Sequence, residues 1–133
     1  MQELKSNALA LNVRDSDGTI KARRIVKSAG KDDYGVKGAL ATSATDKFLG
    51  IAFGNKITGA GQHSTVYAEN GVFEVEIDPT TANIAEGINL TSDGEGRAKA
   101  AGATDSIIGE CFGGYTTGES VIHVILNIRN KQS

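Results

Sequence analysis

Few side chains in this sequence have the types and spacing that chemistry requires. His63 and His123 have no neighbouring cysteine or carboxylate at metal-site spacing, so we expect both on the surface. Glu74 and Glu76 share one face of an expected strand, where paired carboxylates could act as acid and base. No apolar or cationic sequence neighbour would tune either one, so we interpret them as solvated. Cys111 lies within an expected strand with no histidine close in sequence, which predicts a buried structural thiol.

Glycine-rich and acidic motifs also lack the residues that would make them sites. The Gly-Ala-Gly at 59–61 lacks the third glycine of a dinucleotide fingerprint and precedes a strand, not a helix. The Asp-Ser-Asp-Gly at 15–18 begins like a calcium loop, but Ile20 and Val26 stand where that loop needs glycine and glutamate. Nucleic-acid binding by a β-sheet needs aromatic residues interleaved with basic ones, and on the wet face of the hairpin expected at 64–77 only Tyr67 is aromatic. We therefore expect no enzyme, cofactor, metal or nucleic acid, and a structural or binding protein instead.

Composition is consistent with one domain of 133 residues, which is long enough to bury a core. The net charge of -2 is uneven, with nine Lys/Arg and six Asp/Glu in residues 1–47 and five and ten in residues 48–133. The basic series could face an acidic partner or another copy of the chain, or be a solvated strand face. One cysteine, no signal peptide and no long apolar run favour neither secretion nor a membrane. The basic series comprises Lys21, Arg23, Arg24, Lys27 and Lys31.

The stretch at 64–77 predicts a β-hairpin around Asn70-Gly71, because this dipeptide suits a two-residue type I′ turn. The expected pairs are Glu69 with Val72, Ala68 with Phe73, Val66 with Val75, and Ser64 with Ile77. Strict alternation predicts one buried and one wet face. The buried face comprises Val66, Ala68, Phe73, Val75 and Ile77, and the wet face Thr65, Tyr67, Glu74 and Glu76.

Turn signals separate several further elements. We expect strands at 8–13, 20–27 and 121–129, a turn at 15–18, an irregular segment at 28–34, at most one helical turn at 78–87, and an exposed hairpin or loop at 92–102.

The sequence also repeats itself. Residues 45–54 match 104–113, since each has Thr-Asp, two bulky apolar residues, a glycine and a closing Phe-Gly. Residues 37–42 match 86–91 more loosely. These matches predict related units at about 36–68 and 85–126, with Gly50 and Gly109 in equivalent places. We therefore expect an all-β single domain at 8–133, a small barrel or sandwich with an internal duplication, preceded by a flexible arm at 1–7.

From about Gly35 to the end, this motif order resembles that of small bacteriophage head decoration, or cement, proteins. The resemblance rests on 36–40, 46–52 and 70–75, and on their recurrence at 85–90 and 106–111. It implies a protein made in the host cytoplasm that binds the capsid exterior, a homo-oligomer (a trimer, or else a dimer), and the major capsid protein as partner. Other virion or surface modules, such as a tail or fibre domain or a glycan-binding β-sandwich, remain open, as does a small β-barrel enzyme.

The arm is the expected capsid contact, because it is short, polar and precedes the first alternating strand. Its residues are Met1, Gln2, Glu3, Leu4, Lys5, Ser6 and Asn7.

Overall fold

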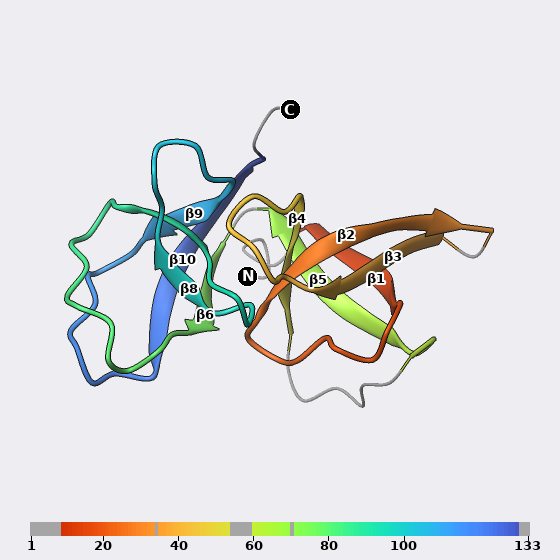
Figure 1. Ribbon diagram of the computed structural model, residues 1–133, viewed down its shortest axis with the longest axis horizontal. Coiled ribbons are helices and arrows are strands. Elements are labelled where there is room, and N and C mark those ends of the chain that lie inside the picture. Colours follow the sequence, from red (N-terminus) through yellow and green to blue (C-terminus); the bar gives the residue numbers. More distant parts are fainter. Residues whose placement is uncertain (1–8, 34, 54–59, 70, 131–133) are drawn as a thin grey trace, which may run out of the picture.

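The computed structural model describes residues 9–33, 35–53, 60–69 and 71–130, and these form two β-sheets that lie side by side (Figure 1). The predicted all-β class is confirmed, and the described residues contain no helix, so 78–87 forms turns. None of the described residues belongs to a helix that could cross a membrane. The strands are β1 (Leu9–Asp15), β2 (Ile25–Asp32), β3 (Gly35–Leu40), β4 (Phe48–Ala52), β5 (His63–Glu69), β6 (Val72–Glu76), β7 (Asn89–Ser92), β8 (Ala98–Ala100), β9 (Ile107–Cys111) and β10 (Val121–Arg129).

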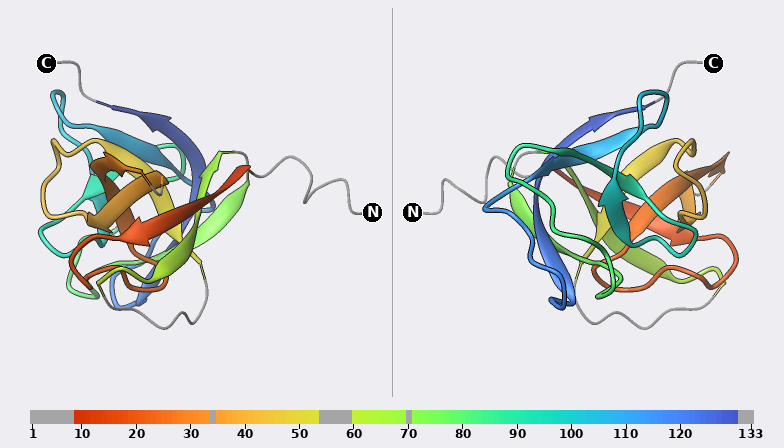
Figure 2. Two further views of the ribbon diagram at one scale, coloured as in Figure 1. Left: turned by 90° about the vertical axis from the view of Figure 1, so that its right-hand side faces the viewer. Right: turned by 60° about the vertical axis from the view of Figure 1, so that its left-hand side comes forward.

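The first sheet closes into a barrel in the order β1-β3-β2-β4-β5. Closure comes from β1, which runs antiparallel to β5 and meets β3 in a short parallel contact where Asp15 lies opposite Gly38. Figure 2 shows β1 and β5 side by side along most of their length. The second sheet has the order β6-β10-β9-β7-β8, and a single parallel bridge joins Ile77 to Ala98.

The two sheets share one topology. Adding five to each strand number of the first sheet gives the pairings of the second: β1·β5 becomes β6·β10, β4·β5 becomes β9·β10, and β2·β4 becomes β7·β9. The parallel bridge between Ile77 and Ala98 takes the place of the β1·β3 contact. The chain thus consists of a first unit, β1–β5, and a second unit, β6–β10.

Register gives the correspondence residue by residue. Gly50 lies opposite Val26 in the first unit, and Gly109 lies opposite Leu90 in the second. The match of 45–54 with 104–113 therefore coincides with β4 and β9. The looser match of 37–42 with 86–91 is wrong, because β3 corresponds to β8 by its pairing. A glycine followed by a short strand is too common a pattern to fix an alignment.

The predicted hairpin at 64–77 is wrong. Both strands exist, but β5 pairs with β1 and β4, while β6 pairs with β10. Asn70 lies outside the described residues, and Gly71 follows at the crossing from the first unit to the second. Because β5 already has a partner on each side, no edge remains for β6. The predicted buried face is confirmed in part, because Val66 and Val75 are fully buried whereas Phe73 is only half-buried.

Two hydrophobic clusters form the core: one lies inside the first unit, and the other lies in the second unit and between the two units. The barrel interior contains Val13, Ile20, Val26, Ala52 and Val66. The larger cluster fills the second unit and extends to the outer surface of the barrel, where it includes side chains of the first unit. Burying each of these apolar side chains contributes roughly 1.5–3 kcal/mol. The first-unit members are Ile25, Ala41, Phe48 and Ile51.

Two further sequence expectations need correction. The strand expected at 20–27 is β2, which begins at Ile25 and continues through most of the segment expected to be irregular. The hairpin expected at 92–102 forms between β7 and β8, but its turn is packed against the barrel: the Ile25 N–H donates to the Gly96 carbonyl at 2.8 Å. Gly96 and Ala98 are buried as a result.

Candidate interaction surface

The groups considered for chemistry do not converge into a reaction centre. Within the described ranges, no three His, Cys, Asp or Glu residues are grouped so as to hold a metal ion. Glu76 is paired with Arg24 at 3.0 Å, whereas Glu74 lies 3.7 Å from the His123 ring. The two carboxylates therefore have different partners. His63 and His123 are both exposed, as predicted.

The prediction of a buried Cys111 is confirmed, because this side chain in β9 is 1% exposed. Burial disfavours the thiolate and raises the pKa of the Cys111 thiol. Its place in the core corresponds to that of Ala52, since Ala52 lies opposite Val66 and Cys111 opposite Val124. The thiol is thus a small core side chain.

We expect thiol reagents to modify Cys111 in the native protein far more slowly than in denaturant. Because the folded state holds the thiol proton more tightly, the contribution of Cys111 to the free energy of unfolding should be fully present below about pH 8.5 and be lost as the pH rises above it. Colorimetric thiol titration with and without denaturant, and urea unfolding at pH 7 and 10, measure both effects. Cys111→Ala is the control for the pH dependence, and rapid stoichiometric modification of the native protein would contradict the assignment.

Two members of the basic series join the two units. Arg23 and Arg24 both contact Glu76 of β6, at 3.3 and 3.0 Å, and Arg24 also donates to the Glu95 carbonyl at 2.8 Å. Lys27 lies 3.9 Å from Asp46 within the first unit. Part of the charge asymmetry between the halves of the sequence is therefore an internal complementarity.

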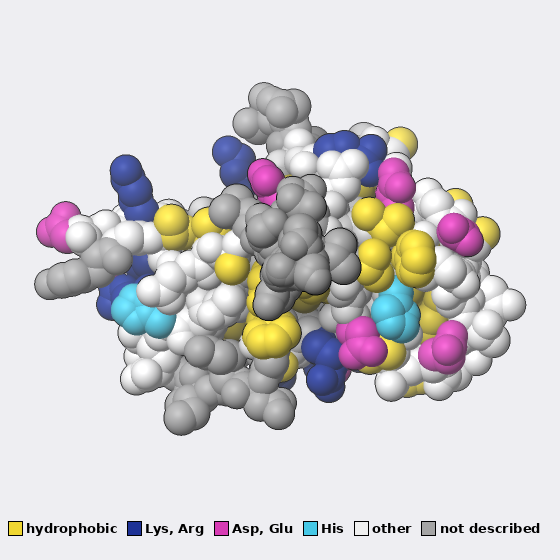
Figure 3. Space-filling model, turned by 180° about the vertical axis from the view of Figure 1, so that it is seen from behind, with side chains coloured by type: hydrophobic (Ala, Val, Ile, Leu, Met, Phe, Trp, Pro, Cys, Tyr) yellow, Lys and Arg dark blue, Asp and Glu magenta, His cyan; other side chains and the backbone are white. Residues whose placement is uncertain are grey.

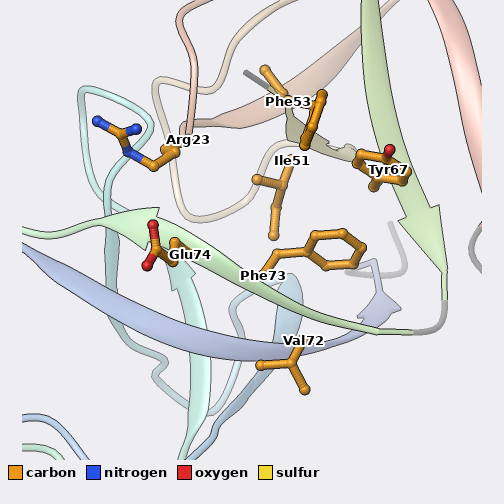
Figure 4. Close-up of a pocket in the computed structure, with 8 residues that line it drawn as sticks. Arg23, Ile51, Phe53, Tyr67, Val72, Phe73 and Glu74 are labelled. Atoms are coloured by element: carbon orange, nitrogen blue, oxygen red, sulfur yellow. The ribbon is translucent and has the colours of Figure 1, made fainter. Parts of the chain in front are cut away.

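A hollow of about 280 Å³ lies along the seam between the units (Figure 4). Tyr67 stands between two phenylalanines, with its ring 5.2 Å from Phe53 in an edge-to-face arrangement and 4.9 Å from Phe73 in a stacked one. Tyr67 is thus not on a wet face, as the hairpin predicted, but covered by the second unit. Arg23 and Glu74 stand at the other end of the hollow.

The outer surface of the second unit carries an apolar patch, which we call the outer face. It consists of Val72, Phe112 and Ile125, which are 46%, 46% and 38% exposed. Val72 and Ile125 lie opposite each other on β6 and β10. Figure 3 shows hydrophobic side chains gathered next to a histidine and two acidic residues on this side of the molecule.

Polar and charged side chains border this patch. Glu74 lies beside His123 at 3.7 Å, and Glu110 lies 3.7 Å from Arg129. An apolar centre with a polar rim is typical of a protein–protein contact surface. Sequence reasoning noted the repeated Phe-Gly but did not identify the outer face; the only signal was that Phe112 ends a repeated motif.

The predicted capsid-contact residues lie outside the described residues. These residues are Met1, Gln2, Glu3, Leu4, Lys5, Ser6 and Asn7. The described chain begins at Leu9, which lies opposite Glu69 at the end of β5.

The geometry therefore defines a tandem pair of five-stranded β-units whose candidate sites are surfaces. No protein-family model matches the chain, and comparison with curated proteins finds no match. Among solved structures, the fold is similar to that of the N base of the head fibre protein gp8.5 of bacteriophage phi29. The TM-score is 0.63 with 16% identity, and the match covers 95% of this chain and 98% of that one.

Proposed function

We propose that this chain is a structural protein of a phage virion that attaches to the outer surface of the capsid. The observation that carries the proposal is the likeness of fold to a head-fibre base over 95% of this chain and 98% of that one. A binding role also suits the described residues, whose candidate sites are a seam and a surface patch and whose histidines and carboxylates do not converge.

In this proposal the protein cements neighbouring capsomers as a homo-oligomer, most simply a trimer, with the major capsid protein as partner. A cement protein binds through several weak contacts at once, and linking them gives a high effective concentration. A rigid scaffold favours this mode, because little conformational entropy is lost on binding. The ion pairs and aromatic stacking along the seam make the two units such a scaffold.

A second candidate is the base of a head fibre, which is favoured because the similar structure is itself a head-fibre base. Both roles require attachment to the capsid. They differ in what attachment does: a cement protein bridges capsomers and raises the temperature at which the capsid disassembles, whereas a fibre base only needs to hold a projecting segment.

The test uses capsids of the phage that encodes the chain, assembled without it. The purified protein should sediment with these capsids and reach a saturating occupancy. A rise in the capsid disassembly temperature at saturation would support cementing, and saturable binding without a rise would support a fibre base. Absence of binding would overturn the proposal.

We expect deletion of residues 1–6 to weaken capsid binding by about tenfold or more while leaving the thermal midpoint of the isolated protein nearly unchanged. An extended segment can add backbone hydrogen bonds to the edge of a sheet on the partner. Ordering a residue costs about 1–2 kcal/mol, so these contacts must exceed that cost for the arm to contribute. Co-sedimentation measures binding, and calorimetry measures the midpoint.

The control variant is Lys21→Gln with Lys31→Gln, which neutralises the two exposed lysines of the basic series. If the basic face were the anchor, this variant would lose binding and wild-type binding would fall steeply with salt. If the truncated protein occupies capsids to the same extent as the wild type, the arm is ruled out as the capsid anchor.

A further inference from the structure

The correspondence between the two units identifies the surface of β9 and β10 that matches the outer surface of β4 and β5. Ile51 lies opposite Tyr67 on β4 and β5, and Glu110 lies opposite Ile125 on β9 and β10. The Phe53 N–H donates to the Thr65 carbonyl at 3.0 Å, and the Phe112 N–H donates to the His123 carbonyl at 2.9 Å. Phe53 and Tyr67 of the first unit therefore correspond to Phe112 and Ile125 of the second.

In the first unit this surface is occupied. The second unit packs on part of it, so that Ile51 is only 2% exposed and Tyr67 stacks on Phe73, whereas Phe53 at its edge stays 54% exposed. The contact is thus one between two copies of the same five-stranded unit, in which the outer surface of β4 and β5 receives the start of β6. Arg23 and Arg24 form ion pairs with Glu76 at the border of this contact.

In the second unit the corresponding surface is the outer face, and no segment among the described residues covers it. Where the first unit has Ile51, the second has Glu110, which lies beside Arg129. Phe112 and Ile125 nevertheless remain apolar, and Val72 of β6 enlarges the patch. A polar replacement at the border combined with apolar residues at the centre suits a surface that is soluble alone and buried in a complex.

We propose that the outer face binds the first unit of a second copy of this chain. The inference rests on the self-association in the proposed function and is independent of capsid binding. A second copy is the favoured occupant because the corresponding surface of the first unit already binds a unit of this kind. At the rim Glu74 lies beside His123 and Glu110 beside Arg129, so no large unpaired charge of one sign has to be covered when another protein surface approaches.

The contact joins the second unit of one copy to the first unit of the next, and is therefore head-to-tail. A head-to-tail contact generates a ring when its rotation closes. The trimer of the proposed function is one such ring, in which every outer face is covered.

The test compares Phe112→Ser/Ile125→Ser with the wild type by light scattering over a range of concentrations. Both side chains point outward, so the variant should keep the native circular dichroism spectrum. We expect a multimer for the wild type and a monomer for the variant, with the dissociation constant raised by about tenfold or more. Ile88→Ser is the matched control, because Ile88 is similarly exposed at 42% and belongs to the second unit, where it precedes β7 and is not part of the outer face; this variant should remain a multimer.

A second variant covers the case in which the double serine variant misfolds. Ile125→Cys can be purified folded and then labelled with a bulky maleimide, and the buried Cys111 will not compete. The label should dissociate the multimer. A wild type that is monomeric at all concentrations, or variants that stay multimeric, would overturn the inference. Variants that stay multimeric but no longer bind capsids would show that the outer face contacts the capsid instead. If the wild-type protein forms the multimer but does not bind capsids, the proposed function is refuted and this inference stands.

Discussion

Gly109→Ala and Gly50→Ala are each expected to lower the free energy of unfolding by several kcal/mol. A Cβ atom on Gly109 would lie 2.8 Å from Val124 Cγ1 and closer still to the Ile125 carbonyl oxygen. On Gly50 it would lie 2.9 Å from Val66 Cγ1 and likewise closer to the Tyr67 carbonyl oxygen. Because the obstructing oxygen belongs to the backbone of a paired strand, it cannot move without breaking the sheet.

We expect a loss of roughly 4 kcal/mol or more from overpacking at either site, a large part of the ~5–15 kcal/mol that stabilises a typical domain. Urea unfolding followed by circular dichroism measures it. Gly94→Ala is the control, since its Cβ would have no neighbour nearer than 4.0 Å, and it should change stability little. Near-wild-type stability of Gly109→Ala would show that β9 and β10 do not approach so closely.

Asp15→Ala should be the most damaging change of a single polar side chain among the turns described. The Asp15 carboxylate is 0% exposed, and its two oxygens accept backbone N–H groups from the loop that follows β1. The Gly18 N–H donates at 2.9 Å, and the Thr19 and Ile20 N–H groups each donate at 3.2 Å. Removing the carboxylate leaves several donors without partners and away from water.

A hydrogen bond to a charged group contributes about 1.5–3 kcal/mol, and buried unsatisfied donors add to the loss, so we expect Asp15→Ala to cost on the order of 3–4 kcal/mol. Asp15→Asn should cost less, because its amide keeps one acceptor oxygen. Asp17→Ala is the control: Asp17 is exposed and accepts only local bonds, so its loss should cost about 1 kcal/mol. Equal midpoints for Asp15→Ala and Asp17→Ala in chemical denaturation would contradict this account.

The tandem architecture accounts for the first of these predictions but not for the second. Gly50 and Gly109 mark the same close approach in the two units, so the sequence kept glycine twice where a neighbouring carbonyl leaves no room for a side chain. Asp15 has no such counterpart, because Ile77 takes the corresponding place in the parallel bridge. The loop after β1 is thus specific to the first unit.

The sequence alone determined the features that depend on local chemistry. Alternation over 121–129 predicted β10 with its bounds, since every second side chain of a half-buried strand must be apolar. The repeated Thr-Asp and glycine positions placed β4 and β9 in correspondence, and the place of Cys111 within an expected strand, with no histidine close in sequence, predicted a buried thiol. These signals are read within one strand or one turn.

Only the tertiary structure decided which strands lie opposite one another. Asn70-Gly71 is compatible with a hairpin, yet β6 pairs with β10 about fifty residues later and β5 pairs with β1. Alternation shows that one face of a strand is buried, but it does not show which element covers that face. The covering element depends on strand pairing, which is decided by competition among all strands for the free edges. The seam at Tyr67 and the outer face at Phe112 and Ile125 arise from this non-local choice, because the second unit covers the first and nothing described covers the second.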